Sequence, residues 1–201
     1  MVTLKGIKVF LGSPTDLSLE RERFLYTINS FNQTEVAEGY IFVPIMNEFM
    51  TGGYGRAQGR INQELLKKLD YGICMFWKTL GSRAGNTDEK TGTEEEYEQL
   101  VELKKKGELR EVVLFFKKIE NNIRIDPGDE LKKLLEFKEN HRGECSYIEF
   151  DESNFNTKIY QHLHDWICKI KTQKVPVQKD ISAANYVIPE EQIISDTEES
   201  R

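Results

Sequence analysis

The stretch that decides the fold is Asp70-Tyr-Gly-Ile-Cys-Met-Phe-Trp77, an apolar run of strand length in a chain of 201 residues. From residue 71 to residue 77 no charged side chain interrupts the run, so neither face of the strand carries a polar stripe. A central strand of a parallel sheet has this pattern because helices cover it on both sides. We therefore expect residues 71–77 to form the middle of a parallel sheet.

Strand and helix patterns alternate along the rest of the chain. The other strand patterns cover 7–11, 40–45, 112–116 and 145–150, and helical patterns begin near residues 16, 61, 93, 129 and 154. Strands that are separated by helices pair in parallel, since each connection needs a crossover. We predict an α/β fold of the flavodoxin-like type, a five-stranded parallel sheet in the order 2-1-3-4-5 with helices on both faces. Pro44 predicts that the second strand either lies near an edge of the sheet or ends there.

Composition indicates one domain followed by a polar tail. The chain is 38% hydrophobic and 31% charged, a balance typical of a globular protein with a polar surface. We assign residues 1–173 to a single α/β domain. Residues 174–201 are rich in Pro, Gln, Asp, Glu and Ser, and we expect them to form an acidic linker or a disordered tail.

Charge, apolar runs and cysteine content indicate which partners and which cellular compartment to expect. The formal net charge is −6 and no basic face is visible, so we expect no direct binding to nucleic acid. No apolar run approaches the roughly 18 residues that span a bilayer, and residues 1–8 lack the apolar core of a signal peptide. We expect a cytoplasmic protein without membrane contacts. Cys74, Cys145 and Cys168 lie in apolar surroundings and are expected to be reduced, buried thiols.

A ligand site is expected where the loops after the first and third strands meet. In the predicted strand order this is the topological switch point, at which open α/β sheets bind their ligands. The two loops are Gly12-Ser-Pro-Thr-Asp16 and residues 78–92, and we expect the glycine-rich loop 51–59 to lie beside them. Trp77 ends the third strand, where its ring can pack under the loop or stack on a flat ligand. Asp70, before that strand, is expected to be a helix-end or loop acid.

The segment Thr93-Glu-Glu-Glu96 has two interpretations. It fits a capping box, in which Thr93 caps the backbone amide three residues on and Glu96 reaches back. In the other interpretation, the long preceding loop delivers Glu96 to the rim of the sheet as a catalytic carboxylate. Thr15 or Asp16 can likewise cap the first helix, although free amides there also attract phosphate or ribose oxygens. The spacing of His, Cys, Asp and Glu predicts no metal site.

Three blocks of the sequence together resemble a known family. They are Val9-Phe-Leu-Gly-Ser-Pro-Thr-Asp-Leu17 with Glu20-Arg-Glu22, then Asp70–Trp77, and then Thr91-Gly-Thr-Glu-Glu-Glu-Tyr97. They look like the domain-of-unknown-function family 4062, a distant relative of Toll/interleukin-receptor (TIR) domains and of nucleoside 2-deoxyribosyltransferases. The resemblance covers roughly residues 5 to 120.

The resemblance implies a TIR-like hydrolase that cleaves an N-glycosidic bond. In the related enzymes a glutamate lies at the start of the helix after the strand-3 loop, within a Gly-Thr-x-x-Glu pattern. This pattern places Glu96 as the catalytic residue, with Glu95 as the alternative if the helix register differs. The residue before Gly-Thr is often Ser or Asp in the transferases and is Thr91 here, a mild departure from the pattern.

The expected substrate is NAD or NADP, and no bound cofactor is expected. Cleavage of the nicotinamide–ribose bond develops oxocarbenium charge, which a nearby carboxylate stabilises. Gly12, Ser13 and neighbouring amides would hold ribose or phosphate, Trp77 would stack on the ligand or form a wall of the pocket, and Arg56 or Arg83 would meet the pyrophosphate.

The resemblance also implies partners and leaves alternatives open. Related proteins are often effectors of prokaryotic antiviral defence systems, so we expect a homo-oligomer that is activated by assembly, with further subunits of such a system as partners. One alternative is a non-catalytic TIR-like module for self-association and signalling. The other is a nucleoside 2-deoxyribosyltransferase, which would exchange bases on deoxynucleosides and would not require NAD.

Overall fold

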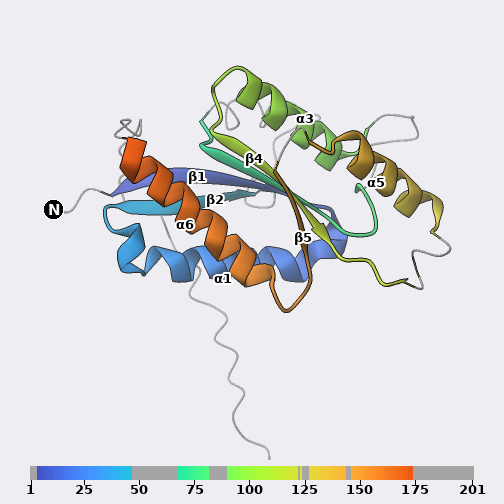
Figure 1. Cartoon of the computed structure of the whole chain (residues 1–201), viewed down its shortest axis with the longest axis horizontal. Coiled ribbons are helices and arrows are strands. Elements are labelled where there is room, and N and C mark those ends of the chain that lie inside the picture. The colour runs from blue at the N-terminus through green and yellow to red at the C-terminus, as the bar shows by residue number, and fades with distance from the viewer. Residues whose placement is uncertain are drawn as a thin grey trace, which may run out of the picture.

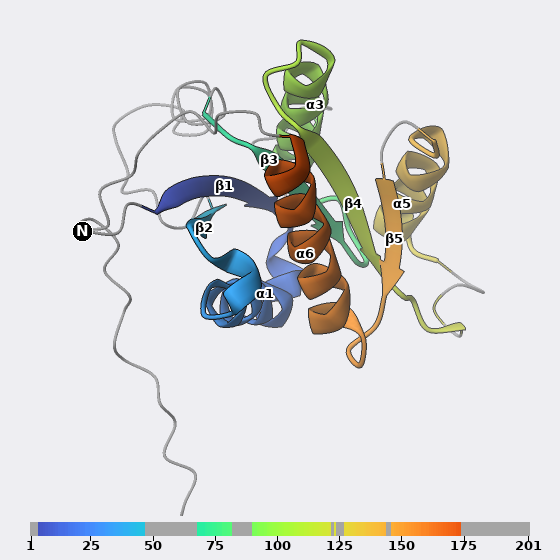
Figure 2. The same cartoon turned by 60° about the vertical axis from the view of Figure 1, so that its left-hand side comes forward.

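A five-stranded parallel sheet lies between two layers of helices (Figures 1 and 2). The computed structural model describes residues 4–46, 68–81, 90–121, 123, 127–143 and 146–173. The strands are β1 (Lys5–Gly12), β2 (Tyr40–Met46), β3 (Tyr71–Phe76), β4 (Glu111–Lys117) and β5 (Ser146–Phe150). The helices are α1 (Ser18–Asn32), α3 (Gly92–Lys105), α5 (Asp129–Asn140) and α6 (Phe155–Gln173), and the 3-10 turns are η1 (Thr15–Leu17) and η2 (Glu35–Ala37).

The strand order is β2-β1-β3-β4-β5 and every pairing is parallel. The predicted fold class and topology are confirmed, and each end of the five strands lies within two residues of the predicted end. β2, which contains Pro44, is an edge strand as predicted. The helix expected near residue 61 and the tail 174–201 lie outside the described residues.

β3 lies at the centre of the sheet, and all six of its residues are buried. It pairs with β1 on one side and with β4 on the other, and helices cover both of its faces. At Gly72 a helix approaches the backbone directly, because an added β-carbon would lie only 2.8 Å from Cδ1 of Leu100 in α3. The uninterrupted apolar sequence of this strand thus reflects burial from two directions.

Alternating strand residues supply two separate cores. One core joins the sheet to α1 and α6, with contributions from Ile7, Val9, Leu11, Phe24, Phe31, Ile73, Phe115, Phe155, Leu163 and Trp166. The other joins it to α3 and α5, with contributions from Phe10, Cys74, Phe76, Tyr97, Leu100, Leu114, Phe116, Leu131, Leu134 and Phe137. β1 therefore turns Phe10, and with it Gly12, toward the α3 side.

Of the two cysteines that the structure describes, one lies in a core and the other lies on the surface. Cys74 is a reduced, buried thiol in the second core, as predicted, whereas Cys168 is reduced but exposed on the outer face of α6. The prediction of burial for Cys168 is wrong because residues 166 and 167 carry the apolar face of α6, which leaves residue 168 on the solvent side. Cys145 lies outside the described residues.

Asp70 lies at the amino end of β3, away from the carboxyl ends of the strands. Its carboxylate accepts a hydrogen bond from the backbone N–H of Lys8 at 2.9 Å, and its Oδ1 lies 3.5 Å from Nε of Arg110. These contacts join Asp70 to the middle of β1 and to the residue that precedes β4, so Asp70 is a loop acid, one of the two roles that the sequence predicts. None of the helices in the described part of the chain combines the length and the hydropathy that a membrane span requires.

A buried ion pair fastens α1 to the carboxyl end of β4. Glu20 is only 2% exposed, and its Oε1 lies 2.7 Å from Nζ of Lys117. Lys117 also reaches Glu152 at 3.3 Å. Burial disfavours the charged lysine, but the hydrogen bonds and charges of Glu20 and Glu152 outweigh this effect and raise the pKa of Lys117. Lys117 therefore keeps its charge at neutral pH although it is largely buried.

We predict that Lys117→Ala lowers the free energy of unfolding by about 3–5 kcal/mol, because it leaves the Glu20 carboxylate buried without its ammonium partner. The double variant Glu20→Leu/Lys117→Met should be more stable than Lys117→Ala, since it removes both charges and restores packing. Urea unfolding measures both values. Lys118→Ala is the control, because the ion pair of Lys118 with Asp151 is largely exposed. An equal loss in Lys117→Ala and Lys118→Ala would contradict a stabilising role for the buried pair.

Candidate functional site

Three segments meet at the carboxyl ends of β1 and β3. Gly12 of β1 lies in register with Cys74 of β3. Beyond the strands, the backbone N–H of Lys78 donates to Oδ2 of Asp16 at 3.3 Å and so joins the two following loops. A β-carbon added to Gly81 would lie 3.3 Å from Oγ1 of Thr93. The described parts of both loops and the start of α3 thus converge at the predicted switch point.

Helix α3 begins with a capping box two residues earlier than predicted. Oγ1 of Thr91 accepts from the backbone N–H of Glu94 at 3.3 Å, and Oε2 of Glu94 accepts from the backbone N–H of Thr91 at 2.8 Å. The Thr91 hydroxyl also donates to the carbonyl of Leu80 at 2.7 Å. The predicted box of Thr93 and Glu96 is wrong, because this anchor to Leu80 makes Thr91 the capping residue and starts the helix at Gly92.

Glu96 is consequently released from capping and lies on the face of α3 that packs against the sheet. Its side chain is only 5% exposed. A β-carbon built on Gly12 would lie 2.6 Å from Oε2 of Glu96, so the carboxylate rests against the bare backbone of β1. The same position is 3.2 Å from Cε1 of Phe10 and 3.5 Å from Sγ of Cys74, which are apolar neighbours. Glu95, in contrast, is exposed.

Two polar atoms in the loop after β1 are buried without a hydrogen-bond partner among the described residues. They are Oγ of Ser13 and Oδ1 of Asp16. The predicted capping of the first helix by Thr15 or Asp16 is wrong, since neither η1 nor α1 has a side-chain cap. Asp16 instead uses its other oxygen, Oδ2, to hold the Lys78 amide. Burial raises the pKa of the Asp16 carboxyl, and the backbone amides of Lys78 and of Asp16 itself, together with the Lys78 ammonium, only partly offset this effect.

Trp77 is half-buried, and the ammonium groups of two lysines lie over its ring. Nζ of Lys78 lies 3.8 Å from the centre of its ring, and Nζ of Lys117 lies 4.4 Å away. The indole also packs against the core that α1 and α6 form with the sheet. Such cation–π contacts hold the lysine side chains in place. The ring therefore gathers positive charge beside the carboxyl end of β3.

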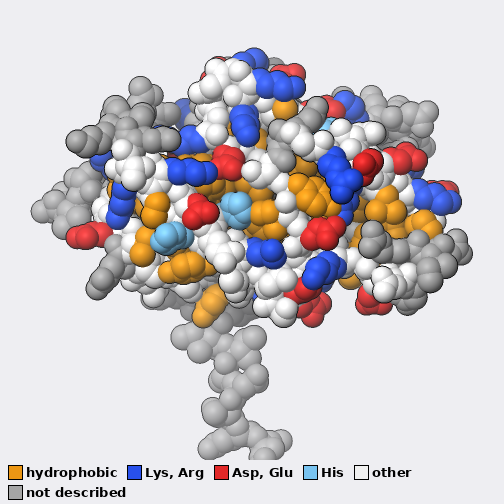
Figure 3. All heavy atoms as spheres, viewed as in Figure 1, with side chains coloured by type: hydrophobic (Ala, Val, Ile, Leu, Met, Phe, Trp, Pro, Cys, Tyr) orange, Lys and Arg blue, Asp and Glu red, His pale blue; other side chains and the backbone are white. Residues whose placement is uncertain are grey.

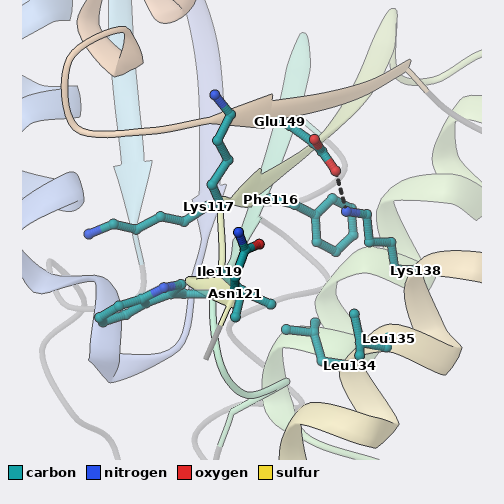
Figure 4. A pocket seen from close by; sticks show the side chains of 10 residues that line it. Phe116, Lys117, Ile119, Asn121, Leu134, Leu135, Lys138 and Glu149 are labelled. Carbon is teal, nitrogen blue, oxygen red and sulfur yellow. Dashed lines mark hydrogen bonds and ion pairs between the residues drawn. The ribbon is translucent and has the colours of Figure 1, made fainter. Parts of the chain in front are cut away.

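Trp77 also borders a hollow on the α5 side of the sheet (Figure 4). The hollow measures about 290 Å³, and its other lining residues are Phe116, Lys117, Lys118, Ile119, Asn121, Leu134, Leu135, Lys138 and Glu149. Figure 4 shows Phe116 and Ile119 on the strand side and Leu134 and Leu135 on α5, with the ion pair of Lys138 and Glu149 at one edge. Glu96 does not line it, so the hollow and the buried carboxylate are separate features.

The sequence did not predict this hollow, because its walls come from residues that alternate in ordinary core patterns. Leu134 and Leu135 belong to the apolar stripe of α5, and Phe116 to the apolar face of β4. Asn121 follows β4 without a motif around it. Arg56 and Arg83, which the resemblance places near a pyrophosphate, lie outside the described residues, so their roles stay predictions.

Comparison with known proteins adds no assignment. No protein-family model matches the chain, and a search of curated proteins finds no relative. The resemblance to family 4062 and to TIR domains therefore rests on the three sequence blocks, and the roles that it implies for Glu96, Ser13 and Trp77 stay predictions.

We predict that Gly12→Ala lowers the free energy of unfolding by about 1–3 kcal/mol, because the new methyl group forces the Glu96 carboxylate and the Phe10 ring to shift. Urea unfolding measures the change. Gly128→Ala is the matched control, since a β-carbon there meets nothing within 4 Å and the residue has an ordinary φ of −64°. If the two variants lose equal stability, Glu96 does not pack against β1 as described.

We predict that the stability of Asp16→Asn relative to the wild type increases between pH 4 and pH 7. The raised native pKa means that the unfolded chain releases the Asp16 proton at lower pH, near the ordinary value of about 4. As the pH rises above this value the wild type therefore loses stability through this group, until the pH passes the native pKa. Asn has no such titration, and Lys78 and Glu20 are unchanged in both proteins. Urea unfolding at several pH values tests this, and a difference that stays constant would contradict it.

Proposed function

We propose that the chain is a nucleotide N-glycosidase that cleaves the nicotinamide–ribose bond of NAD or NADP. The observation that carries the proposal is the position of Glu96. This glutamate has no part in the capping box of α3, and its carboxylate lies against Gly12 at the topological switch point of the sheet. The resemblance to TIR-like enzymes selects the same residue on independent grounds, because Glu96 stands in their Gly-Thr-x-x-Glu pattern.

The chemistry suits a buried carboxylate. When the bond between nicotinamide and C1 of the ribose breaks, its electron pair neutralises the cationic nicotinamide and positive charge develops on the sugar. A carboxylate in apolar surroundings stabilises that charge more strongly than it would in water. Water then adds to C1 and releases a proton, which yields nicotinamide together with ADP-ribose from NAD or ADP-ribose 2′-phosphate from NADP. Because the leaving group departs as a neutral molecule, the reaction needs no strong acid.

Apolar neighbours strengthen this role. Phe10 and Cys74 lie beside the position where Glu96 meets Gly12, and Gly12 leaves the space that a larger residue would fill. Glu96 is held by the fold at this place and is not a mobile surface side chain, since it is almost completely buried. Such preorganisation is what electrostatic catalysis requires.

The proposal includes the setting that the resemblance implies. The protein would act in the cytoplasm as the effector of a prokaryotic defence system, and assembly of several copies would activate it. The homo-oligomer and the other subunits of such a system are partners proposed on the same basis. The nucleotide is the substrate, so no additional cofactor enters the reaction.

A second candidate function is a non-catalytic module for self-association. It is favoured by the surface of α1 and α6, where hydrophobic side chains lie between the charged ones (Figure 3). Tyr26 is 69% exposed and Tyr160 is 37% exposed, and both line a groove of about 560 Å³ between these helices. This surface lies on the opposite side of the sheet from α3 and Glu96.

We predict that the concentrated protein releases nicotinamide from NAD and that Glu96→Gln lowers the rate by about 100-fold or more, because the neutral amide cannot stabilise the developing charge. Glu94→Gln is the matched control: it makes the same change two residues earlier, and Gln preserves the capping box. Glu95→Gln tests the alternative register. Chromatography follows nicotinamide release and measures the rates of the wild type and of the three variants.

An unchanged rate in Glu96→Gln would remove Glu96 from the mechanism. If the wild type releases no nicotinamide at any protein concentration and Glu96→Gln changes only the melting temperature, the self-association module becomes the better assignment. Base exchange on deoxynucleosides without NAD cleavage would instead indicate a deoxyribosyltransferase.

A further inference from the structure

We propose that Asp16 and Lys78 complete a subsite for a phosphorylated ribose beside Ser13, the residue to which the resemblance already gives a role in holding ribose or phosphate. In this subsite Ser13 and Asp16 bind sugar hydroxyls and Lys78 binds the phosphate. This inference rests on the proposed function, because it names the part of the nucleotide that the carboxyl end of β1 and β3 recognises.

The loop after β1 contains two buried oxygens that have room for a further hydrogen bond. Oγ of Ser13 and Oδ1 of Asp16 are shielded from solvent, and within the described part of the chain neither makes a hydrogen bond. Buried polar atoms in folded proteins almost always have a partner, and a buried atom without one is costly. A carboxylate oxygen can only accept hydrogen bonds. The missing partner of Asp16 is therefore a donor, such as a hydroxyl group of a sugar.

A hydrogen bond from the loop after β3 holds Asp16 in place. Its Oδ2 accepts from the backbone N–H of Lys78, which joins the loop after β1 to the loop after β3. One oxygen of the carboxylate thus organises the loops while the other is left for a ligand. Carboxylates commonly bind ribose hydroxyls in nucleotide sites, because a charged acceptor gives a stronger hydrogen bond than a neutral one.

The ammonium group of Lys78 lies at the same edge of the sheet. Its ammonium lies over the Trp77 ring and forms no ion pair with a carboxylate in the described ranges. The neighbouring lysines differ in this respect, since Lys117 pairs with Glu20 and Glu152 and Lys118 pairs with Asp151. The Trp77 ring thus holds the Lys78 ammonium in place, and no ion pair neutralises its charge among the described residues. Such an ammonium group is suited to bind phosphate.

The combination defines the class of ligand. A nucleoside would satisfy the acceptors and leave Lys78 unused, whereas inorganic phosphate would satisfy Lys78 and bring little to Asp16. A phosphorylated ribose satisfies both groups with one molecule. Since Ser13 directly follows Gly12, against which the Glu96 carboxylate packs, the sugar would be held next to the proposed catalytic residue.

The test measures binding in the Glu96→Gln background, so that no turnover interferes. Isothermal titration calorimetry compares ADP-ribose with adenosine. We expect ADP-ribose to bind at least about tenfold more tightly, and Lys78→Gln to weaken ADP-ribose by about tenfold while changing adenosine less than about twofold. Asp16→Asn and Ser13→Ala should weaken both ligands, because both contain ribose. Lys118→Gln removes the same charge from a lysine that already has a partner, and should change neither affinity.

Melting temperatures keep the test independent of folding. Ser13→Ala deletes an unpartnered buried hydroxyl, so it should melt at the same temperature as its parent or higher while it binds ADP-ribose less tightly. The subsite is refuted if adenosine binds as tightly as ADP-ribose, if Lys78→Gln has no larger effect than Lys118→Gln, or if ADP-ribose does not bind at millimolar concentration. Binding as expected without nicotinamide release from the wild type would support the subsite and refute the proposed glycosidase.

Discussion

The arrangement of the site depends on the close approach of α3 to the sheet, which two glycines permit. Leu100 packs where a β-carbon of Gly72 would be, and Glu96, one turn earlier on the same helix face, packs where a β-carbon of Gly12 would be. Gly72 lies on β3 opposite Phe10, so the two glycines belong to adjacent strands. A side chain at either position would push α3 outward, and the carboxylate would lose its place beside β1.

The start of α3 decides which residues face the sheet. Thr91 is tied to Leu80 through its hydroxyl and to Glu94 through the capping box, so the phase of the helix is set before its first full turn. Glu96 then faces inward, and Glu95 faces solvent. In a helix neighbouring residues are about 100° apart, and a shift of one residue in the start would bring Glu95 toward the sheet in its place.

The carboxyl edge of the sheet brings charges of both signs close together. Lys117 is neutralised by Glu20 and Glu152, and Asp16 is engaged through one oxygen by the Lys78 amide. The groups that remain without such partners in the described part of the chain are Oγ of Ser13, Oδ1 of Asp16 and the ammonium of Lys78. All three lie in the loops that leave β1 and β3, where parallel sheets place their ligands. Ion pairs between elements and polar groups without a partner therefore lie at the same edge of the sheet, and the proposed subsite would use the second kind of group.

The sequence by itself predicted the fold class, the strand order and the segments that meet at the carboxyl ends of β1 and β3. Periodicity, the doubly apolar β3 and the alternation of strands and helices were sufficient, because burial on two faces leaves a pattern in the chain that local reading detects. Only the tertiary structure decided which threonine caps α3, that Glu96 packs on Gly12, and that Asp16 holds the Lys78 amide. The capping sequence fits two registers equally well, and the choice depends on the contact of Thr91 with Leu80, eleven residues away along the chain. Contacts between distant segments of this kind follow from how the elements pack, which a local pattern of residues does not encode.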